Sequence, residues 1–168
     1  MRNKILVFGV VCSFLGLLAL QGHAEKPEPT IHVGTYDNRA IAIAYAPSKY
    51  NPVPDKMREY KKAKETGDEE RMKELEAWGE KQQRKLHRQG FGRVPVDDLL
   101  AHVKDRLPEV ARRTGVDIIA WECNYAADNV EVVDVTTELV KLFDPSEKTL
   151  NFVKQLEDQP PVALDKIE

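Results

Sequence analysis

The chain has 168 residues, of which 25 are basic and 28 are acidic, so its formal net charge is −3. This length suits a single domain with a modest hydrophobic core. A mildly acidic balance without a basic stripe argues against nucleic acid and against an anionic membrane surface as partners.

The first 24 residues have the three parts of a signal peptide. Two basic residues precede an uncharged apolar run, Ile5–Leu20, and small residues stand at positions −3 and −1 of a cleavage point after Ala24. The run has about 16 residues, fewer than the roughly 20 that span a bilayer. We therefore expect export to the periplasm or cell envelope and a mature chain that begins at Glu25. An uncleaved membrane anchor is the alternative.

Cleavage would leave 144 residues with 23 basic and 28 acidic side chains, a net charge of −5. Cys123 is then the single cysteine, which excludes an intramolecular disulfide. It ends the apolar run 116–123, so we expect a small buried side chain rather than a reactive thiol. The mature chain has no further apolar run long enough to span a membrane.

Residues 25–54 are expected to supply the first strand and helix of a folded body. Residues 31–36 predict a short strand, and Asp37 or Asn38 can cap a helix over residues 39–45. That helix is almost wholly apolar, so we expect it to be buried. Three prolines then form a stiff connector.

The composition changes sharply at the start of residues 55–89, which are charged and helical in propensity. Gly67 suits a left-handed helix end, and Asp68 is a good N-cap for a second helix over residues 69–88. The pattern predicts a polar helical hairpin, an arm that projects from the body. A solvated, partly disordered insertion is the alternative.

The arm has few large apolar side chains. Gly79 and Gln82 stand where a coiled coil would place apolar residues. The apolar and aromatic residues that remain are candidate contacts for a partner: Met57, Tyr60, Met72, Leu75 and Trp78. Three of them, Met57, Tyr60 and Trp78, are also expected to close the two helices on each other.

Residues 90–144 are expected to complete the body. Gly90–Gly92 predicts a hinge, and an apolar stripe predicts one long helix that starts at Val96, is kinked at Pro108 and ends at Gly115. The sequence that follows predicts a strand over residues 116–123, a strand over residues 130–133 and a short helix over residues 136–143.

Residues 145–168 predict a capped helix and an extended tail. Asp144-Pro145-Ser146-Glu147 has the capping pattern of a helix start, and Leu150, Val153 and Leu156 recur at helical spacing. The whole chain therefore predicts an α+β fold, with helices packed on a small β-body and a projecting α-helical hairpin.

The sequence has no specific catalytic motif, and we expect no catalytic residue, cofactor or metal. His32, His87 and His102 lie in separate elements, and no phosphate loop or nucleophile elbow occurs. Weaker candidates are His102 as a base, Asp117 with Glu122 as a carboxylate pair, and Trp121 with Tyr125 as pocket walls. A spacing of five puts that carboxylate pair on opposite faces of a regular strand.

Two blocks of sequence carry a family likeness. One is Val33–Ala40 with Pro47-Ser48 soon after it, and the other runs from Leu107-Pro108 through Gly115–Ile119 to Val133–Val140. The first resembles the strand and Asp-x-x-Arg opening of the Skp/OmpH family of periplasmic chaperones. The second is similar to that family's helix–Gly–strand segment and its closing Asp-x-Thr-x-Glu-Val signature.

This resemblance implies a body that trimerises and arms that enclose unfolded outer-membrane proteins. On that basis we expect a homo-oligomer, a trimer by resemblance, that acts as a holdase for unfolded envelope proteins. Two alternatives stay open. One is a non-catalytic envelope scaffold that shares the body, and the other is an enzyme whose site the sequence does not reveal.

Overall fold

The structure is a computed structural model that describes residues 30–156 and 158–167. The predicted signal peptide and the expected mature start at Glu25 lie outside the described residues. The elements run in the order β1 (Ile31–Thr35), α1 (Asn38–Tyr45), α2 (Val53–Thr66), α3 (Glu69–Phe91), α4 (Asp97–Leu100), the 3₁₀ segment η1 (Ala101–Arg106), α5 (Leu107–Thr114), β2 (Ile118–Ile119), β3 (Val130–Asp134), α6 (Thr136–Val140), the 3₁₀ segment η2 (Lys141–Phe143), α7 (Glu147–Leu156) and the 3₁₀ segment η3 (Leu164–Lys166).

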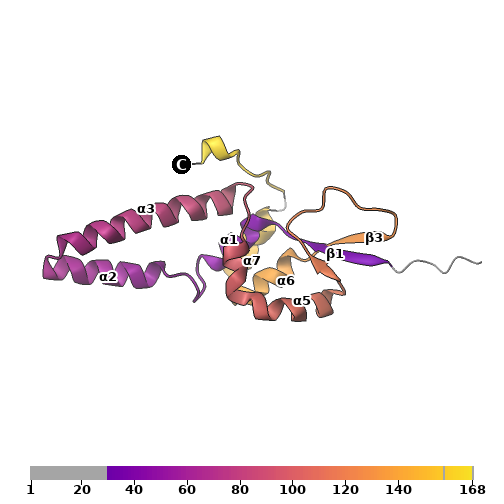
Figure 1. Cartoon of the computed structure of the whole chain (residues 1–168), viewed down its shortest axis with the longest axis horizontal. Coiled ribbons are helices and arrows are strands. Elements are labelled where there is room, and N and C mark those ends of the chain that lie inside the picture. The colour runs from indigo at the N-terminus through magenta and orange to yellow at the C-terminus, as the bar shows by residue number, and fades with distance from the viewer. Residues whose placement is uncertain (1–29, 157, 168) are drawn as a thin grey trace, which may run out of the picture.

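The molecule is a mixed helix-and-strand body with a helical arm, which confirms the expected α+β class. In Figure 1 the arm, α2 and α3, extends to one side, and the strands lie at the opposite end of the body. No helix among the described residues is long and apolar enough to cross a membrane.

The body contains a three-stranded sheet in the order β2-β1-β3, in which all neighbours are parallel. One face lies on the helical core. There Gly34 pairs with Ile119 and Val133, and a Cβ at Gly34 would lie only 3.0 Å from Val135 and 3.2 Å from Val116. The glycine therefore lets these two valines, each next to a strand, pack directly against β1.

The other face of the sheet is thinly covered. The two crossovers run in opposite directions across the sheet, so right-handed connections place them on opposite faces. The first crossover contains the helices of the body, whereas the second, residues 120–129, has no helix and runs above the sheet in Figure 1. Three β-branched side chains on this face stay exposed: Ile31 at 39%, Ile118 at 51% and Val132 at 45%.

Helix α1 lies at the centre of the body, and the expectation that it is buried is confirmed. Seven of its eight residues are buried, with Ile43 partly exposed. Asp37 caps it, accepting a hydrogen bond from Arg39 N at 2.8 Å. The Arg39 guanidinium returns to Asp37 at 2.6 Å and also donates to the carbonyl of Gln159 at 2.7 Å. This pair, in which Arg39 is buried and Asp37 half-buried, connects the start of α1 to the segment that follows α7.

Asn38 has a different role from the cap that the sequence allowed. Its amide donates to the carbonyls of Gln89 and Gly92, both at 2.9 Å. Gln89 is itself buried and donates to Asp98 at 2.8 Å. The last turns of α3 are therefore part of the body, and the expected arm boundary at residue 89 falls inside a helix.

The predicted hinge at Gly90–Gly92 is wrong, because α3 continues through Phe91. A Cβ at Gly90 would lie 4.0 Å from Ala42, so α3 packs on α1 at this point. A Cβ at Gly92 would meet Leu164 at 2.6 Å. Gly92 therefore permits a close approach of Leu164 at the root of the arm, whereas Gly90 lies at an ordinary contact distance from α1.

The predicted single helix from Val96 is also wrong. The chain forms α4, then the 3₁₀ segment η1, then α5. Pro108 lies in the first turn of α5, where its missing N–H would have no intrahelical partner anyway, so it starts a helix instead of kinking one. The apolar stripe is nevertheless inside, with Leu100, Val103 and Val110 buried and Leu107 half-buried. Gly115 ends α5 in the left-handed conformation, as expected.

The predicted strand 116–123 is shorter than expected, because only Ile118 and Ile119 pair with β1. The chain then leaves the sheet, and Cys123 is half-buried with its thiol donating to the carbonyl of Tyr125 at 3.1 Å. The expectation of a buried cysteine is therefore wrong.

The predicted C-terminal helix is present. Ser146, rather than Asp144, caps α7, with its hydroxyl oxygen accepting from Thr149 N at 3.2 Å. Val153 is buried, and Leu150 and Leu156 pack on the core. The inward face of α7 is therefore the one that the sequence predicts.

Candidate functional site

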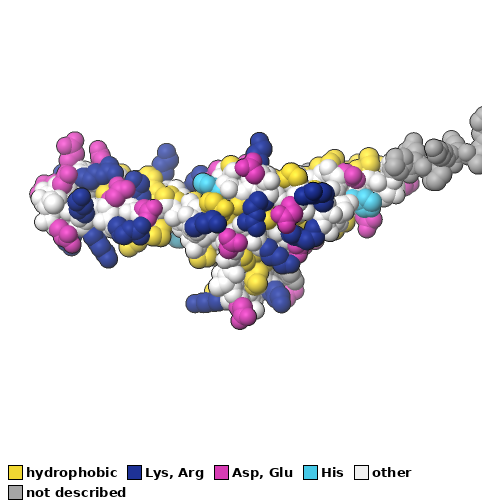
Figure 2. All heavy atoms as spheres, turned by 90° about the horizontal axis from the view of Figure 1, so that it is seen from below, with side chains coloured by type: hydrophobic (Ala, Val, Ile, Leu, Met, Phe, Trp, Pro, Cys, Tyr) yellow, Lys and Arg dark blue, Asp and Glu magenta, His cyan; other side chains and the backbone are white. Residues whose placement is uncertain are grey.

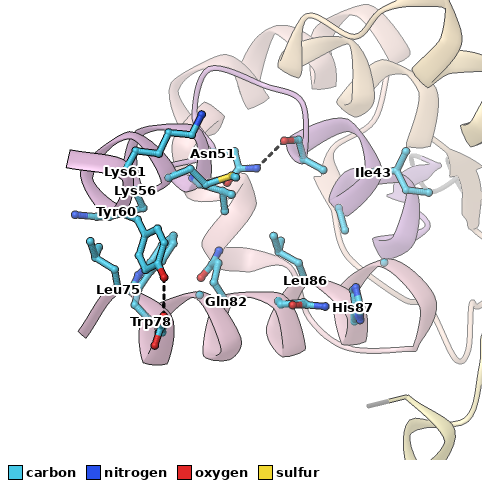
Figure 3. A pocket seen from close by; sticks show the side chains of 18 of the residues that line it. Ile43, Asn51, Lys56, Tyr60, Lys61, Leu75, Trp78, Gln82, Leu86 and His87 are labelled. Atoms are coloured by element: carbon cyan, nitrogen blue, oxygen red, sulfur yellow. Dashed lines mark hydrogen bonds between the residues drawn. The ribbon is translucent and has the colours of Figure 1, made fainter. Parts of the chain in front are cut away.

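A groove between α2 and α3 forms a concave surface on the arm. It encloses about 970 Å³ and is lined largely by apolar atoms. Figure 3 shows side chains of the two helices directed into the space between them, with Ile43 of α1 at the end next to the body. We call this feature the arm groove.

The turn at the tip holds the two helices in a hairpin. Gly67 ends α2 with φ 69°, a left-handed conformation that glycine adopts without strain. Asp68 then caps α3 by accepting from Arg71 N at 3.0 Å. Both features are as the sequence predicts, and they reverse the chain within two residues.

The two helices of the arm lie closer together near the tip than near the body (Figure 1). Ala63 and Leu75 are buried in the half next to the tip. Polar bonds join the helices in the same half, from Arg71 to Glu59 at 2.6 Å and from the Tyr60 hydroxyl to Glu76 at 2.7 Å. Toward the body the ribbons of α2 and α3 separate in Figure 1.

The residues on the facing sides explain why the helices do not close. Gly79 and Gln82 both line the arm groove, and neither offers the large apolar side chain that would fill it. Met57 remains 58% exposed. The expectation that Met57 helps to close the helices on each other is therefore wrong. Tyr60 does join them through its hydroxyl, and Trp78 is half-buried in the wall of the groove.

The rim of the arm groove on α2 is basic. Lys56, Lys61 and Lys64 border it, and Lys56 pairs with Glu59 at 2.9 Å. Within the part of the chain that the structure describes, Lys61 and Lys64 have no ion pair. Figure 2 shows acidic and basic side chains interspersed over the hairpin, with hydrophobic atoms between them toward the body.

The ionisable groups near the tip are already satisfied by one another. Hydrogen bonds from Lys56 and Arg71 lower the pKa of Glu59, and the hydrogen bond to Glu76 raises the pKa of Tyr60. Glu76 is the one acidic residue in the lining, and it keeps its negative charge while it accepts from that hydroxyl. Three lysines line the same groove, so the charge at the rim is positive on balance.

Four of the five predicted contact residues, Met57, Tyr60, Leu75 and Trp78, line the arm groove, whereas Met72 does not. The sequence analysis missed Ile43, Leu86 and Phe91, which line the end next to the body. Leu86 was detectable, since it follows Leu75 by eleven residues, three helical turns on the same face. Ile43 was not, because its helix is otherwise buried.

The weaker catalytic candidates lie apart from one another. Asp117 accepts from His32 N at 2.9 Å, whereas Glu122 pairs with Arg93 at 2.6 Å. His102 stacks against the rings of Tyr45 and Tyr50 at centroid distances of 5.6 Å and 5.5 Å. These groups therefore do not converge on a common point.

Trp121 and Tyr125 do not form a shared pocket. Trp121 borders a shallow cavity of about 380 Å³ near the carboxyl ends of the strands, whereas Tyr125 is 84% exposed and lies outside it. Among the described residues, no group of three or more His, Cys, Asp or Glu side chains is placed to hold a metal ion.

Comparisons with known proteins do not add an assignment: no protein-family model, curated protein or solved structure matches this chain.

Proposed function

We propose that this chain is an exported, non-catalytic polypeptide-binding protein of the cell envelope. In this proposal it acts as a Skp-like holdase that keeps apolar segments of unfolded envelope proteins in the arm groove. The observation that carries the proposal is the groove itself, an open apolar surface on a projecting arm.

Exposed apolar side chains in the arm groove support binding of a polypeptide. Met57 and Phe91 are 58% and 54% exposed, and both line the same groove. Clustered apolar surface with a polar rim is typical of a protein interaction site. Burying it would remove apolar area from water, which is the main favourable term in association.

The order of elements supports the Skp/OmpH resemblance as the finer proposal. A strand leads into a buried helix, an arm, a helical segment, two further strands and a closing helix. Self-association into a trimer is part of the same proposal. The exposed β-branched residues Ile31, Ile118 and Val132 support it, because parallel sheets are usually covered on both faces.

Light scattering on dilution of a urea-unfolded outer-membrane protein tests the holdase proposal. We expect the protein to suppress scattering and the Met57→Glu variant to lose much of that effect, because the new carboxylate lies in the apolar groove. Met72→Glu is the matched control, since Met72 is on the arm but outside the groove lining. No suppression by the wild type, or equal suppression by Met57→Glu, would contradict the proposal.

The exposed sheet face favours a second candidate, an envelope scaffold whose role is assembly. Such a protein would self-associate without suppressing aggregation. We expect Val132→Asp to lower the molar mass in solution, because it places a charge on the exposed apolar face. A scaffold is the better description if the mass falls in this variant and the wild type fails the scattering assay.

A further inference from the structure

We infer that the occupant of the arm groove is an amphipathic α-helix of a partner protein, about four turns long, with an acidic flank. The inference rests on the proposed function and specifies the conformation and charge of the bound segment. Three independent features carry it: the spacing of the groove walls, a bare stretch of backbone in α3, and the charge of the rim.

The residues that line the arm groove recur at helical spacing. Positions separated by three or four residues line it on both helices: Val53, Met57, Tyr60 and Lys64 on α2, and Leu75, Gly79, Gln82, Leu86 and Gly90 on α3. A third helix can pack its own ridges between two such walls, as in a three-helix bundle. From Leu75 to Gly90 the α3 wall covers 16 residues and about 23 Å, which matches a partner helix of about 16 residues.

Gly79 lines the arm groove without a side chain, so the backbone of α3 faces the groove at this position. Gly79 has no positive φ, and a Cβ placed on it would meet nothing within 4 Å. Neither backbone conformation nor packing within the described structure therefore requires glycine at this helical position, where alanine would be more stable. An isolated glycine of this kind often has a packing or functional reason. A partner backbone that approaches α3 closely at this point supplies one.

The basic rim of the arm groove favours a partner with negatively charged side chains. Lys61 and Lys64 lie one turn apart on α2 and lack an ion pair among the described residues. Glutamate or aspartate on the flank of a bound helix would lie beside them. A symmetric contact between the grooves of two copies would bring the same lysines together, and like charges at an interface oppose binding. Charge complementarity therefore favours an acidic partner helix over a second copy.

Peptide binding tests the inference directly. The probe is a synthetic peptide of about 16 residues, with leucines on one helical face and glutamates along one flank. An isomer of the same composition, alternating leucine and glutamate, is the extended probe. Since an isolated helix of this length is marginal in water, helix formation on binding is visible as a gain in circular dichroism. The chain has two tryptophans, so Trp121→Phe leaves Trp78 in the groove wall as the single reporter.

We expect the helical probe to shift the fluorescence of Trp78 and to gain helicity, and the alternating isomer to bind more weakly. Lys61→Glu/Lys64→Glu should weaken binding about tenfold, on the scale of two exposed ion pairs. Lys62→Glu/Lys73→Glu is the matched control, because these exposed lysines do not line the groove, and it should bind nearly as well as the wild type.

The Gly79→Ala variant shows whether Gly79 has a role in binding or only an effect on helix stability. We expect it to raise the melting temperature, because alanine favours the helix, and to weaken probe binding about tenfold through the added methyl group. A higher melting temperature with unchanged affinity would overturn the close approach at Gly79 and with it the inference.

The outcomes also distinguish the inference from the proposed function. Preference for the alternating isomer, together with suppression of aggregation, would overturn the helical occupant and leave the holdase standing. Equal loss of binding in the two lysine pairs would overturn the acidic flank. Binding of neither peptide, with no suppression of aggregation, would remove both.

Discussion

The body and the arm of this protein are stabilised in different ways. The body has a continuous apolar core in which Ile41, Val110, Leu139 and Val140 are completely buried. Beyond its root, the arm buries little more than Ala63 and Leu75. Its helices depend instead on propensity, on the caps at the tip and on surface ion pairs within and between helices.

Two tyrosines show the same contrast. Burial, with a contribution from Asp97, raises the pKa of Tyr36 in the body to about 12. In the arm, the hydrogen bond to Glu76 is the main cause that raises the pKa of Tyr60. Tyr36 is therefore a residue of the core, whereas Tyr60 is held mainly by a hydrogen bond at the surface of the arm.

The largest expected effect comes from a charge in the core of the body. Val110→Asp should unfold the protein, because an unpaired buried charge costs several kcal/mol, comparable with the stability of a small domain. Met57→Asp is the matched change in the arm and should shift stability by about 0.5 kcal/mol or less. Thermal melting followed by circular dichroism checks both. Similar melting of the two variants would break the distinction between body and arm.

A smaller loss is expected at the start of α1. Asp37→Ala removes the helix cap and leaves the buried Arg39 guanidinium without its carboxylate, so we expect a loss of about 3 kcal/mol. Asp37→Asn keeps a capping oxygen and should lose less. Urea unfolding measures both variants, and a loss below about 1 kcal/mol for Asp37→Ala would show that the pair is not important to the body.

The smallest effect is expected from shortening the arm. Replacing residues 59–76 by a Gly-Ser linker of about eight residues should leave cooperative melting almost unchanged, because long surface loops close at modest entropic cost. Deleting residues 55–89 should be far more destabilising, since it removes buried Gln89 and the core contact of Leu86.

Melting and solution mass of the two deletion variants sharpen the boundary between the regions. Loss of cooperative melting in the shorter deletion would mean that the outer arm belongs to the core. Equal stability of the two deletion variants would mean that the root of α3 does not belong to the core.

Local signals in the sequence were sufficient for most elements. Gly67 and Asp68 specify the hairpin turn through one left-handed residue and one cap, and both act within a few residues of chain. The apolar residues of α1 and α7 likewise indicate their buried faces without reference to distant parts of the chain. Four of the five arm residues suggested as contacts line one groove for the same reason, since helical spacing determines which side chains share a face.

The sequence by itself therefore determined features that depend on neighbours along the chain: the turn and cap at the tip of the arm, the buried faces of α1 and α7, and the polar character of the arm. Only the tertiary structure decided the features that need partners distant in sequence. These are the parallel order β2-β1-β3, the use of Asn38 to hold the root of α3, and the open arm groove beside α1. A periodic pattern shows which residues share a face, but the distance between two such faces depends on packing across the whole fold.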